Sequence, residues 1–306
     1  MTSAMPPATN RPHPEPQPPV HPDHDRGLEF DVRTLVARRS ALGLLGGAGL
    51  AALAGCTDGS SGAGAGSSAA TSGSSGASAS PSVTASGTAS GGAASAVDTQ
   101  VPAETAGPFP GDGSNGQDVL DDTGIVRTDL RSSIGTSTTT ATGVPLTVNL
   151  TVLDSAAGYG AMPGVAVYVW HCDAQGRYSM YSSGVEDENY LRGVQPTDAS
   201  GTATFTTVFP GCYPGRWPHI HFEVYRSTAE ATSAGQIVRT SQLALPAAAS
   251  EAVYADTATY PGSADALAGT SLTQDMVFGD DGGIHQLATV TGDASSGYVA
   301  NLTIGV

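Results

Sequence analysis

The stretch from residue 57 to about residue 97 is almost wholly Ser, Gly, Ala and Thr, with Pro81 as its only stiffening residue. Such a composition holds too few apolar side chains to bury a core and is typical of a flexible spacer. A compact domain can therefore form only from residues 98–306, a length of 209 residues. That length suits one domain with a real hydrophobic core, and no internal repeat divides it.

Residues 98–306 contain short segments of high β propensity, and long helical periodicity is absent. Residues 146–153, for example, alternate apolar and polar side chains as a half-buried strand does. The expected strands are 146–153, 164–171, 202–208, 219–225, 236–245, 284–291 and 298–304. Residues 249–254 and 263–267 indicate at most a helical turn or two. Many short strands at roughly even spacing predict an all-β fold, an antiparallel β-sandwich or barrel.

The first 55 residues have the features of an export signal. Residues 1–37 are Pro-rich and polar, which indicates a disordered leader. The pair Arg38 and Arg39 then opens a Gly/Ala/Leu stretch that is too short and too Gly-rich for a spanning helix. A twin-arginine pair points to the export route that carries folded proteins. We therefore expect residues 1–55 to be a twin-arginine signal peptide with a long disordered n-region.

The export signal closes on Leu-Ala-Gly-Cys at residues 53–56, which resembles a bacterial lipobox. Lipidation of Cys56 would anchor the protein to a membrane without spanning it. Ordinary cleavage at a small-residue site and an uncleaved anchor are the alternatives. We expect residues 56–97 to be a linker and residues 98–306 to be the folded domain, exported to the cell surface or the extracellular space.

The chain is acidic, with a formal net charge of −16, and its 12 basic residues are all Arg. From Cys56 onward there are 7 Arg against 23 Asp plus Glu, so this part carries the whole net charge. Such a surface keeps a domain soluble and repels a phosphate backbone, and no Arg stripe offsets the repulsion. The composition argues against a nucleic-acid partner.

Apart from Cys56, the chain contains Cys172 and Cys212. Two cysteines in an exported domain often form a disulfide. A bridge here would hold the segments around Tyr178 and Tyr213 close together. We expect this disulfide, and two buried free thiols are the alternative.

The pair His219 and His221 lies on an expected strand. Successive side chains of a strand point to opposite faces, so both imidazoles project to one side while Ile220 and Phe222 project to the other. Two imidazoles on one face can share a metal ion. For His-x-His alone, a strand with two solvated or hydrogen-bonded histidines is the commoner explanation.

Two tyrosines add phenols to this pair. Tyr213 lies just upstream in a Pro/Gly loop that could fold its ring back toward the histidines, and Tyr178 follows a Gly-containing turn. Zinc sites usually take Cys, His or carboxylate, and cupric sites favour several imidazoles. Phenolate is a hard anion that suits ferric iron, and the ion drives deprotonation of a group whose free pKa is about 10. Either tyrosine alone is more simply a packing residue, so the inference of a ferric site depends on all four side chains.

Five stretches of the sequence resemble the intradiol ring-cleavage dioxygenases, a family that includes the protocatechuate and catechol 1,2-dioxygenases. These stretches are 104–110, 127–131, 170–179, 189–198 and 209–222. The resemblance spans about residues 99–306. It implies a β-sandwich of the intradiol type with one non-haem Fe(III) ion per chain. The implied reaction cleaves a catechol with dioxygen, between the two hydroxyl-bearing carbons, to a cis,cis-muconate-type product.

Matching motif positions imply four iron ligands, namely Tyr178, Tyr213, His219 and His221. Tyr178 would stay bound, whereas the substrate would displace Tyr213. The implied partners are therefore a small catecholic substrate and dioxygen.

Arg216 matches the family's active-site arginine, which would stabilise negative charge on the reacting substrate. Gln242 matches a polar residue of the substrate pocket less closely. A surface salt bridge for Arg216 and an exposed strand position for Gln242 are the alternatives.

The sequence also departs from the cytoplasmic members of that family. Their helical N-terminal region, which helps them form dimers, is replaced here by the spacer. The loop from residue 213 to residue 219 is short, which predicts a shallower and more open site.

Two other functions are compatible with the sequence. The first is a surface-anchored β-sandwich that binds a metal or ligand without oxygenase activity. The second is a different metalloenzyme, such as a copper oxidase. Visible colour separates the first from a ferric enzyme, because charge transfer from tyrosinate to iron colours a protein burgundy.

Overall fold

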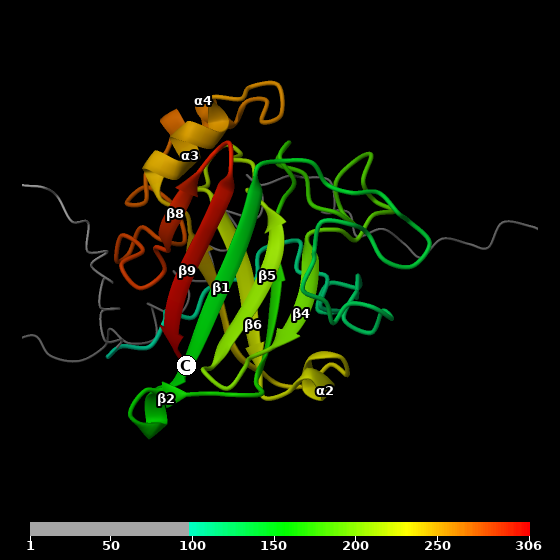
Figure 1. Cartoon of the computed structure of the whole chain (residues 1–306), viewed down its shortest axis with the longest axis vertical. Helices are drawn as coiled ribbons and strands as arrows, with labels where there is room; N and C mark the ends of the chain where they lie inside the picture. The colour runs from blue at the N-terminus through cyan, green and yellow to red at the C-terminus, as the bar shows by residue number, and fades with distance from the viewer. Residues whose placement is uncertain (1–97) are drawn as a thin grey trace, which may run out of the picture. The chain divides into compact units, whose positions relative to one another are not determined.

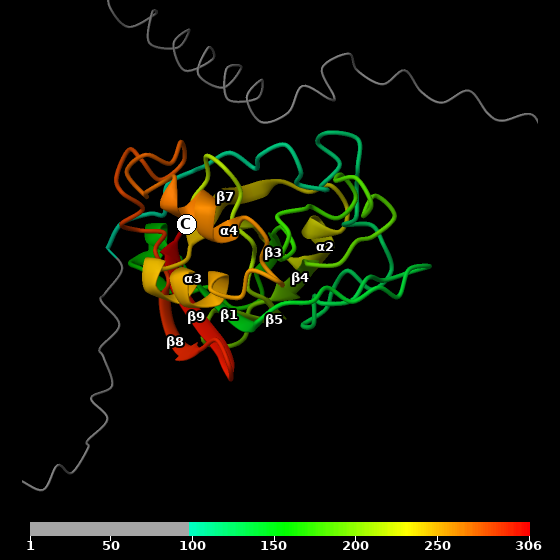
Figure 2. The same ribbon diagram turned by 90° about the horizontal axis from the view of Figure 1, so that it is seen from above.

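The computed structural model of the chain describes residues 98–306. The expected signal peptide at 1–55, Cys56 and the linker at 56–97 lie outside the described residues. The described part contains two β-sheets that form two layers (Figures 1 and 2). The predicted β-sandwich is therefore confirmed. No helix among residues 98–306 is long and apolar enough to cross a membrane.

The first sheet is built around its longest strand, β1. Its strands are β1 (Pro145–Asp154), β2 (Gly160–Ala161), β5 (Thr202–Val208), β8 (Thr289–Asp293) and β9 (Gly297–Gly305). Strand β1 pairs antiparallel with β5 and β2 but parallel with β9. The predicted antiparallel pairing therefore fails at β1–β9, because the two strands enter the sheet from the same end.

The second sheet has the strand order β4-β3-β6-β7, and every pair in it is antiparallel. Its strands are β3 (Ala166–Trp170), β4 (Arg192–Pro196), β6 (His219–Tyr225) and β7 (Ile237–Ala244). Strand β6 lies at the centre. In its register, His221 is opposite Trp170 of β3 on one side and Gln242 of β7 on the other.

The two sheets differ in how they are buried. Strand β1 alternates between buried and partly exposed residues, whereas all of β3 and β6 is buried. Ile220 and Phe222 of β6 join the core between the sheets. Residues Val119, Leu120 and Ile125 cover the opposite face, where they cluster with the aromatic residues of β3. The face of β6 that carries its histidines is therefore enclosed as well.

Short helices complete the described part: η1 (Ser155–Ala157), α2 (Thr228–Ala231), α3 (Ala247–Tyr254) and α4 (Ser263–Ala268). Helices α3 and α4 lie together at the upper end of the sheets in Figure 1. Helix α3 begins after Pro246, which occupies the N-cap position with an extended backbone (φ −65°, ψ 144°). The predicted helical turns at 249–254 and 263–267 are confirmed.

The strand predicted at 284–291 is wrong over its first half. Gly282 and Gly283 have positive φ angles of 72° and 68°, and the amides of Gln286 and Leu287 donate to the Gly283 carbonyl. This turn continues to residue 286, and the strand begins at Thr289. Apolar residues there indicated a strand, but Ile284 is 72% exposed.

Strand β4 and helix α2 were not predicted. The Arg-Gly-Val-Gln-Pro sequence of β4 lacks the alternation that identifies a strand, and its pairing with β3 supplies the extended structure instead. Helix α2 is only four residues long and is capped by Ser227.

Leu150 tests the core between the sheets, because its side chain is fully buried in β1. We expect Leu150→Ala to lower the free energy of unfolding by about 2–5 kcal/mol, through lost apolar contacts and a cavity. Chemical denaturation measures the change. The control, Val299→Ala, removes a side chain that is 36% exposed, and its effect should stay below about 1 kcal/mol. Equal losses in the two variants would contradict the described packing.

Candidate metal centre

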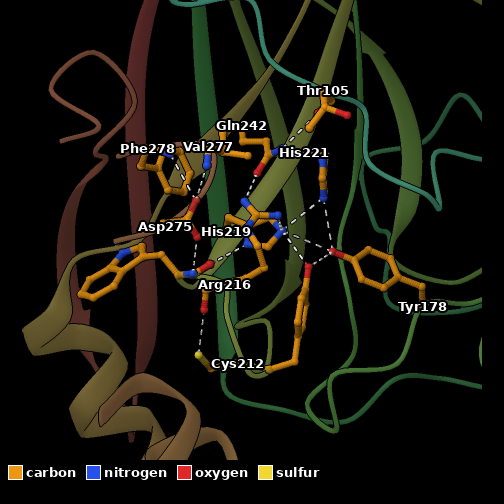
Figure 3. A network of polar contacts seen from close by, with 12 residues as sticks. Thr105, Tyr178, Cys212, Arg216, His219, His221, Gln242, Asp275, Val277 and Phe278 are labelled. Atoms are coloured by element: carbon orange, nitrogen blue, oxygen red, sulfur yellow. Dashed lines mark hydrogen bonds and ion pairs between the residues drawn. The ribbon is translucent and has the colours of Figure 1, made fainter. Parts of the chain in front are cut away.

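Four polar side chains converge on the enclosed face of β6 (Figure 3). The Tyr178 hydroxyl lies 3.1 Å from the Tyr213 hydroxyl, 3.4 Å from His219 Nε2 and 3.3 Å from His221 Nε2. The Tyr213 hydroxyl lies 3.1 Å from His219 Nε2, and the two Nε2 atoms are 3.1 Å apart. The structure thus brings together the four residues that the resemblance implies as ligands. We call them the four-residue cluster.

The histidines reach this cluster because residues two apart on β6 share a face. His219 Nδ1 lies 2.5 Å from the Trp217 carbonyl oxygen, so this nitrogen carries the proton and Nε2 presents its lone pair to the cluster. The His221 ring stacks on Trp170 at 4.9 Å between centroids, with 8° between the planes. His221 Nδ1 has no hydrogen-bond partner within the described part.

Tyr178 is positioned by a turn that follows β3. The carboxylate of Asp173 accepts the backbone N–H groups of Gln175 and Arg177 and pairs with the Arg177 guanidinium. Gly176 occupies the left-handed position of this turn, with φ of +78°. Hydrogen bonds within residues 173–177 therefore fix the loop that precedes Tyr178.

Gly211 joins the Tyr178 loop to the Tyr213 loop. Its N–H donates to the Asp173 carbonyl at 3.0 Å. A Cβ at Gly211 would lie 2.8–2.9 Å from the carbonyls of Asp173 and Ala174 and the nitrogen of Gly176. Only glycine permits this approach.

The predicted disulfide between Cys172 and Cys212 is wrong, because both residues are buried free thiols. Each sulfur faces a backbone carbonyl. Cys172 Sγ lies 3.4 Å from the Gly211 oxygen, and Cys212 Sγ lies 3.5 Å from the Arg216 oxygen. Backbone contacts at Gly211, and not a covalent bridge, hold the two tyrosine loops together.

The spacing of the four-residue cluster suits one metal ion. Metal bonds of about 2.0–2.1 Å to nitrogen or oxygen place tetrahedral ligands about 3.3–3.4 Å apart and right-angled ligands about 2.9 Å apart. The observed separations of 3.1–3.4 Å lie in that range. Residues 98–306 contain no group of three or more His, Cys, Asp or Glu that could hold a metal. A metal at this centre would therefore need the phenol oxygens, which are hard donors that suit ferric iron.

Burial sets the protonation of the cluster. It lowers the pKa of His219 to about 3, with a further contribution from Arg216, and it lowers the pKa of His221 well below its usual value. Both imidazoles are therefore neutral at pH 7 and able to bind a metal. Burial also raises the pKa of Tyr178 and of Tyr213. A phenolate at either position therefore requires a compensating cation.

Arg216 lies beside the cluster in a buried network that Figure 3 shows. Its Nε donates to Asp275 Oδ2 at 3.0 Å, its Nη2 donates to Gln242 Oε1 at 2.5 Å, and its Nη1 lies 3.4 Å from His219 Nε2. Gln242 Nε2 in turn donates to the Thr105 carbonyl at 3.0 Å. The alternatives of a surface salt bridge for Arg216 and an exposed position for Gln242 are excluded, since both side chains are buried.

Asp275 is the residue of this network that sequence analysis missed. It comes from the long loop between α4 and β8, where no motif or periodicity marks it. Its Oδ2 also accepts the Trp217 N–H at 2.6 Å, and its Oδ1 accepts the N–H groups of Val277 and Phe278. Burial alone would raise the pKa of Asp275, but the charge of Arg216 and these N–H donors lower it overall.

The opening segment of the described chain forms one wall of the centre. A Cβ at Gly107 would lie 3.2 Å from His221 Cε1, and the Phe109 ring lies 5.2 Å from the Tyr178 ring. The opposite side is more open, because Tyr213 is partly exposed and Pro214 and Gly215 are exposed.

Part of the chain matches one family profile, and several solved structures are similar to its described part. Residues 125–238 match the sequence profile of the family described as Dioxygenase. A solved intradiol ring-cleavage dioxygenase from Tetranychus urticae has a TM-score of 0.52 at 22% identity, over 68% of this chain and 94% of that one. A second solved dioxygenase gives a TM-score of 0.51 at 21% identity, with the same coverage of both chains.

A third similar structure is the dioxygenase domain of a carbohydrate-binding fusion protein from Streptomyces sp. SirexAA-E. It gives a TM-score of 0.43 at 25% identity, over 68% of this chain and 98% of that one. No curated protein matches the chain significantly in sequence. The resemblance to intradiol ring-cleavage dioxygenases is confirmed, and the described part of the chain has their fold.

His171 directly follows β3, and its burial predicts that the stability of the protein depends on pH. Burial lowers its pKa from 6.5 to about 4, and both ring nitrogens are hydrogen-bonded, to Cys172 O and Thr207 Oγ1. Between pH 6.5 and 4 the unfolded state therefore binds a proton that the folded state does not. The free energy of unfolding should fall as pH falls through this window, by on the order of 3 kcal/mol for this residue.

Urea denaturation of metal-free protein at several pH values measures this loss. His219 and His221 contribute in the same direction, so the informative comparison is the wild type against His171→Gln. The variant should lose less stability between pH 6.5 and 4. Parallel pH profiles of the free energy of unfolding in the wild type and the variant would show that His171 has the same pKa in the folded and the unfolded state.

Proposed function

We propose that this chain is an Fe(III)-dependent dioxygenase that cleaves a catechol between its two hydroxyl-bearing carbons, giving a cis,cis-muconate-type product. The observation that carries the proposal is the convergence of two phenols and two imidazoles beside a buried arginine. The intradiol fold and the Dioxygenase match at 125–238 support it.

The chain would hold the ion through Tyr178, Tyr213, His219 and His221. A ferric ion held there would supply Lewis acidity, which would make the ring of a bound catechol reactive toward dioxygen. Tyr178, His219 and His221 are each 3% exposed, which suits permanent ligands. Their burial also excludes water from the reacting atoms.

Tyr213 is suited to exchange with the substrate. It is partly exposed and is followed by the exposed Pro214 and Gly215. Burial raises the pKa of its phenol, so a Tyr213 phenolate released from a cation would take up a proton. That proton would come from a catechol hydroxyl. Tyr213 would therefore serve as both a displaceable ligand and a base.

Arg216 would act on the substrate through one N–H group of its guanidinium that is held in a fixed position. Its Nη1 is directed toward the cluster, while Asp275 and Gln242 hold its other nitrogens. A guanidinium fixed in this way need not reorganise when negative charge develops on the ring. Asp275 and Gln242 are positioning residues in this arrangement.

Variants of Arg216 and Tyr213 separate catalysis from metal binding. Arg216 is not a ligand, so Arg216→Ala should retain iron and colour but lose about 10²–10³ in turnover. Tyr213→Phe removes a ligand and should change the visible spectrum together with the rate. Oxygen consumption with catechol, measured beside the spectrum of iron-loaded protein, gives both readouts.

Arg216→Lys refines this test, because a point charge lacks the planar fork of guanidinium and should restore activity only in part. Full activity in Arg216→Ala would remove this residue from the mechanism. A colourless iron-free protein without turnover would favour a binding module instead.

We also propose that the twin-arginine signal exports the domain after it has folded and taken up iron. This order avoids metal loading outside the cell. Lipidation at Cys56 would then anchor the domain through the linker at 56–97. Cys56→Ser should release soluble protein to the medium, as measured by detergent partitioning and immunoblotting. A variant that partitions like the wild type would contradict the lipobox.

A further inference from the structure

The positive charge near the four-residue cluster comes from one residue of the described chain. Arg216 is the only arginine of residues 98–306 with a polar contact to the cluster. The whole chain contains no Lys, and its net charge is −16. Whether the charge of Arg216 is paired with another charge therefore decides how strongly the site binds an anionic ring substituent.

The charge of Arg216 is already neutralised by a buried carboxylate. Its side chain is 7% exposed and that of Asp275 is 0% exposed, with 3.0 Å between Nε and Oδ2. Nη2 is taken by Gln242, which leaves Nη1 facing the cluster. The ion pair presents one directed N–H group to the site but no net charge.

The other arginines of the described part do not replace it. Arg192 is wholly buried, and its N–H groups donate to the carbonyls of Phe109, Pro110 and Ser179. Arg177 and Arg131 pair with Asp173 and Asp129. Arg127 donates to backbone carbonyls, Arg239 donates to Gln100, and Arg226 is exposed to solvent.

A bound ion leaves no spare positive charge either. The three charges of ferric iron would be balanced by one Tyr178 phenolate and a catechol dianion, whose two protons would go to Tyr213 and to solvent. Three of the four cluster residues are only 3% exposed, so a carboxylate elsewhere on the ring would bring an unpaired negative charge close to buried and otherwise neutral side chains. Burying a charge without a partner is strongly unfavourable.

We propose that this site selects catechols whose remaining ring substituents are uncharged, and that the Arg216–Asp275 ion pair causes this selectivity. The inference rests on the proposed function and names its substrate class. Catechols with neutral ring substituents belong to the preferred class. Catechols with a ring carboxylate are discriminated against.

A matched substrate pair tests the selectivity in the iron-loaded full chain. We would compare 3,4-dihydroxybenzamide with 3,4-dihydroxybenzoate, because the two differ in charge but hardly in size. The amide should have at least about a tenfold higher kcat/KM, mainly through a lower KM. Calorimetry without oxygen should show the same order of affinities. Equal values for the two compounds would overturn the inference.

Catechol itself separates the two proposals. If catechol is cleaved and the benzoate is cleaved as well as the amide, the selectivity is refuted and the proposed function stands. If no catechol is cleaved, the proposed function fails. The anaerobic affinities still test the selectivity in that case, and equal affinities refute it.

Asp275→Asn tests the cause, since it leaves the Arg216 charge unpaired. The ratio of kcat/KM for the amide to that for the benzoate should fall at least about threefold, because the benzoate gains affinity. Asp129→Asn is the matched control. It makes the same change in net charge at a surface ion pair, whose side chains are 41% and 52% exposed, and should leave the preference unchanged.

Circular dichroism and thermal unfolding establish whether Asp275→Asn folds. A folded variant with the wild-type preference would refute the role of the ion pair. If the variant does not fold, the amide-to-benzoate ratio of the wild type still decides whether the selectivity exists.

Discussion

The structure depends on burying a set of polar side chains between the second sheet and the segments that cover it. An unpartnered polar group costs free energy in such an environment, so each one needs a partner or a cation. Within the cluster the phenol O–H groups can donate to the imidazole Nε2 atoms, and His221 Nδ1 is its one polar atom without a partner among the described residues. All four side chains can also present a lone pair to one point, so this buried set of polar groups is suited to bind a cation.

The second sheet can carry this cluster because it is covered on both faces. Strand β6 uses Ile220 and Phe222 for the core between the sheets and leaves its other face to His219 and His221. Asp275 then binds this strand to a distant loop, because one carboxylate accepts both the Arg216 guanidinium and the Trp217 amide. The Trp217 carbonyl in turn orients His219. The same strand thus contributes both to the packing of the core and to the orientation of the site residues.

Sequence analysis found the parts of the site that motifs and periodicity mark. The alternation along 219–225 placed both histidines on one face, and the resemblance pointed to Tyr178, Tyr213, Arg216 and Gln242. It missed Asp275, because a long-range ion pair leaves no local pattern. It paired Cys172 with Cys212 on compartment alone, whereas the backbone turns each sulfur toward a carbonyl. The strand predicted at 284–291 was based on apolar residues, whereas Gly282 and Gly283 just before it direct a turn.

The opening segment of the described chain forms one wall of the site, so the functional domain has to include it. Thr105 accepts a hydrogen bond from Gln242, and Gly107, with φ of +74°, lies so close to His221 that a Cβ there would be 3.2 Å from Cε1. The Dioxygenase match starts at residue 125, well after both contacts. A boundary drawn at that match would keep the four-residue cluster and lose one wall of the site. The smallest fragment that keeps the site complete therefore begins upstream of Thr105, close to where the described chain starts.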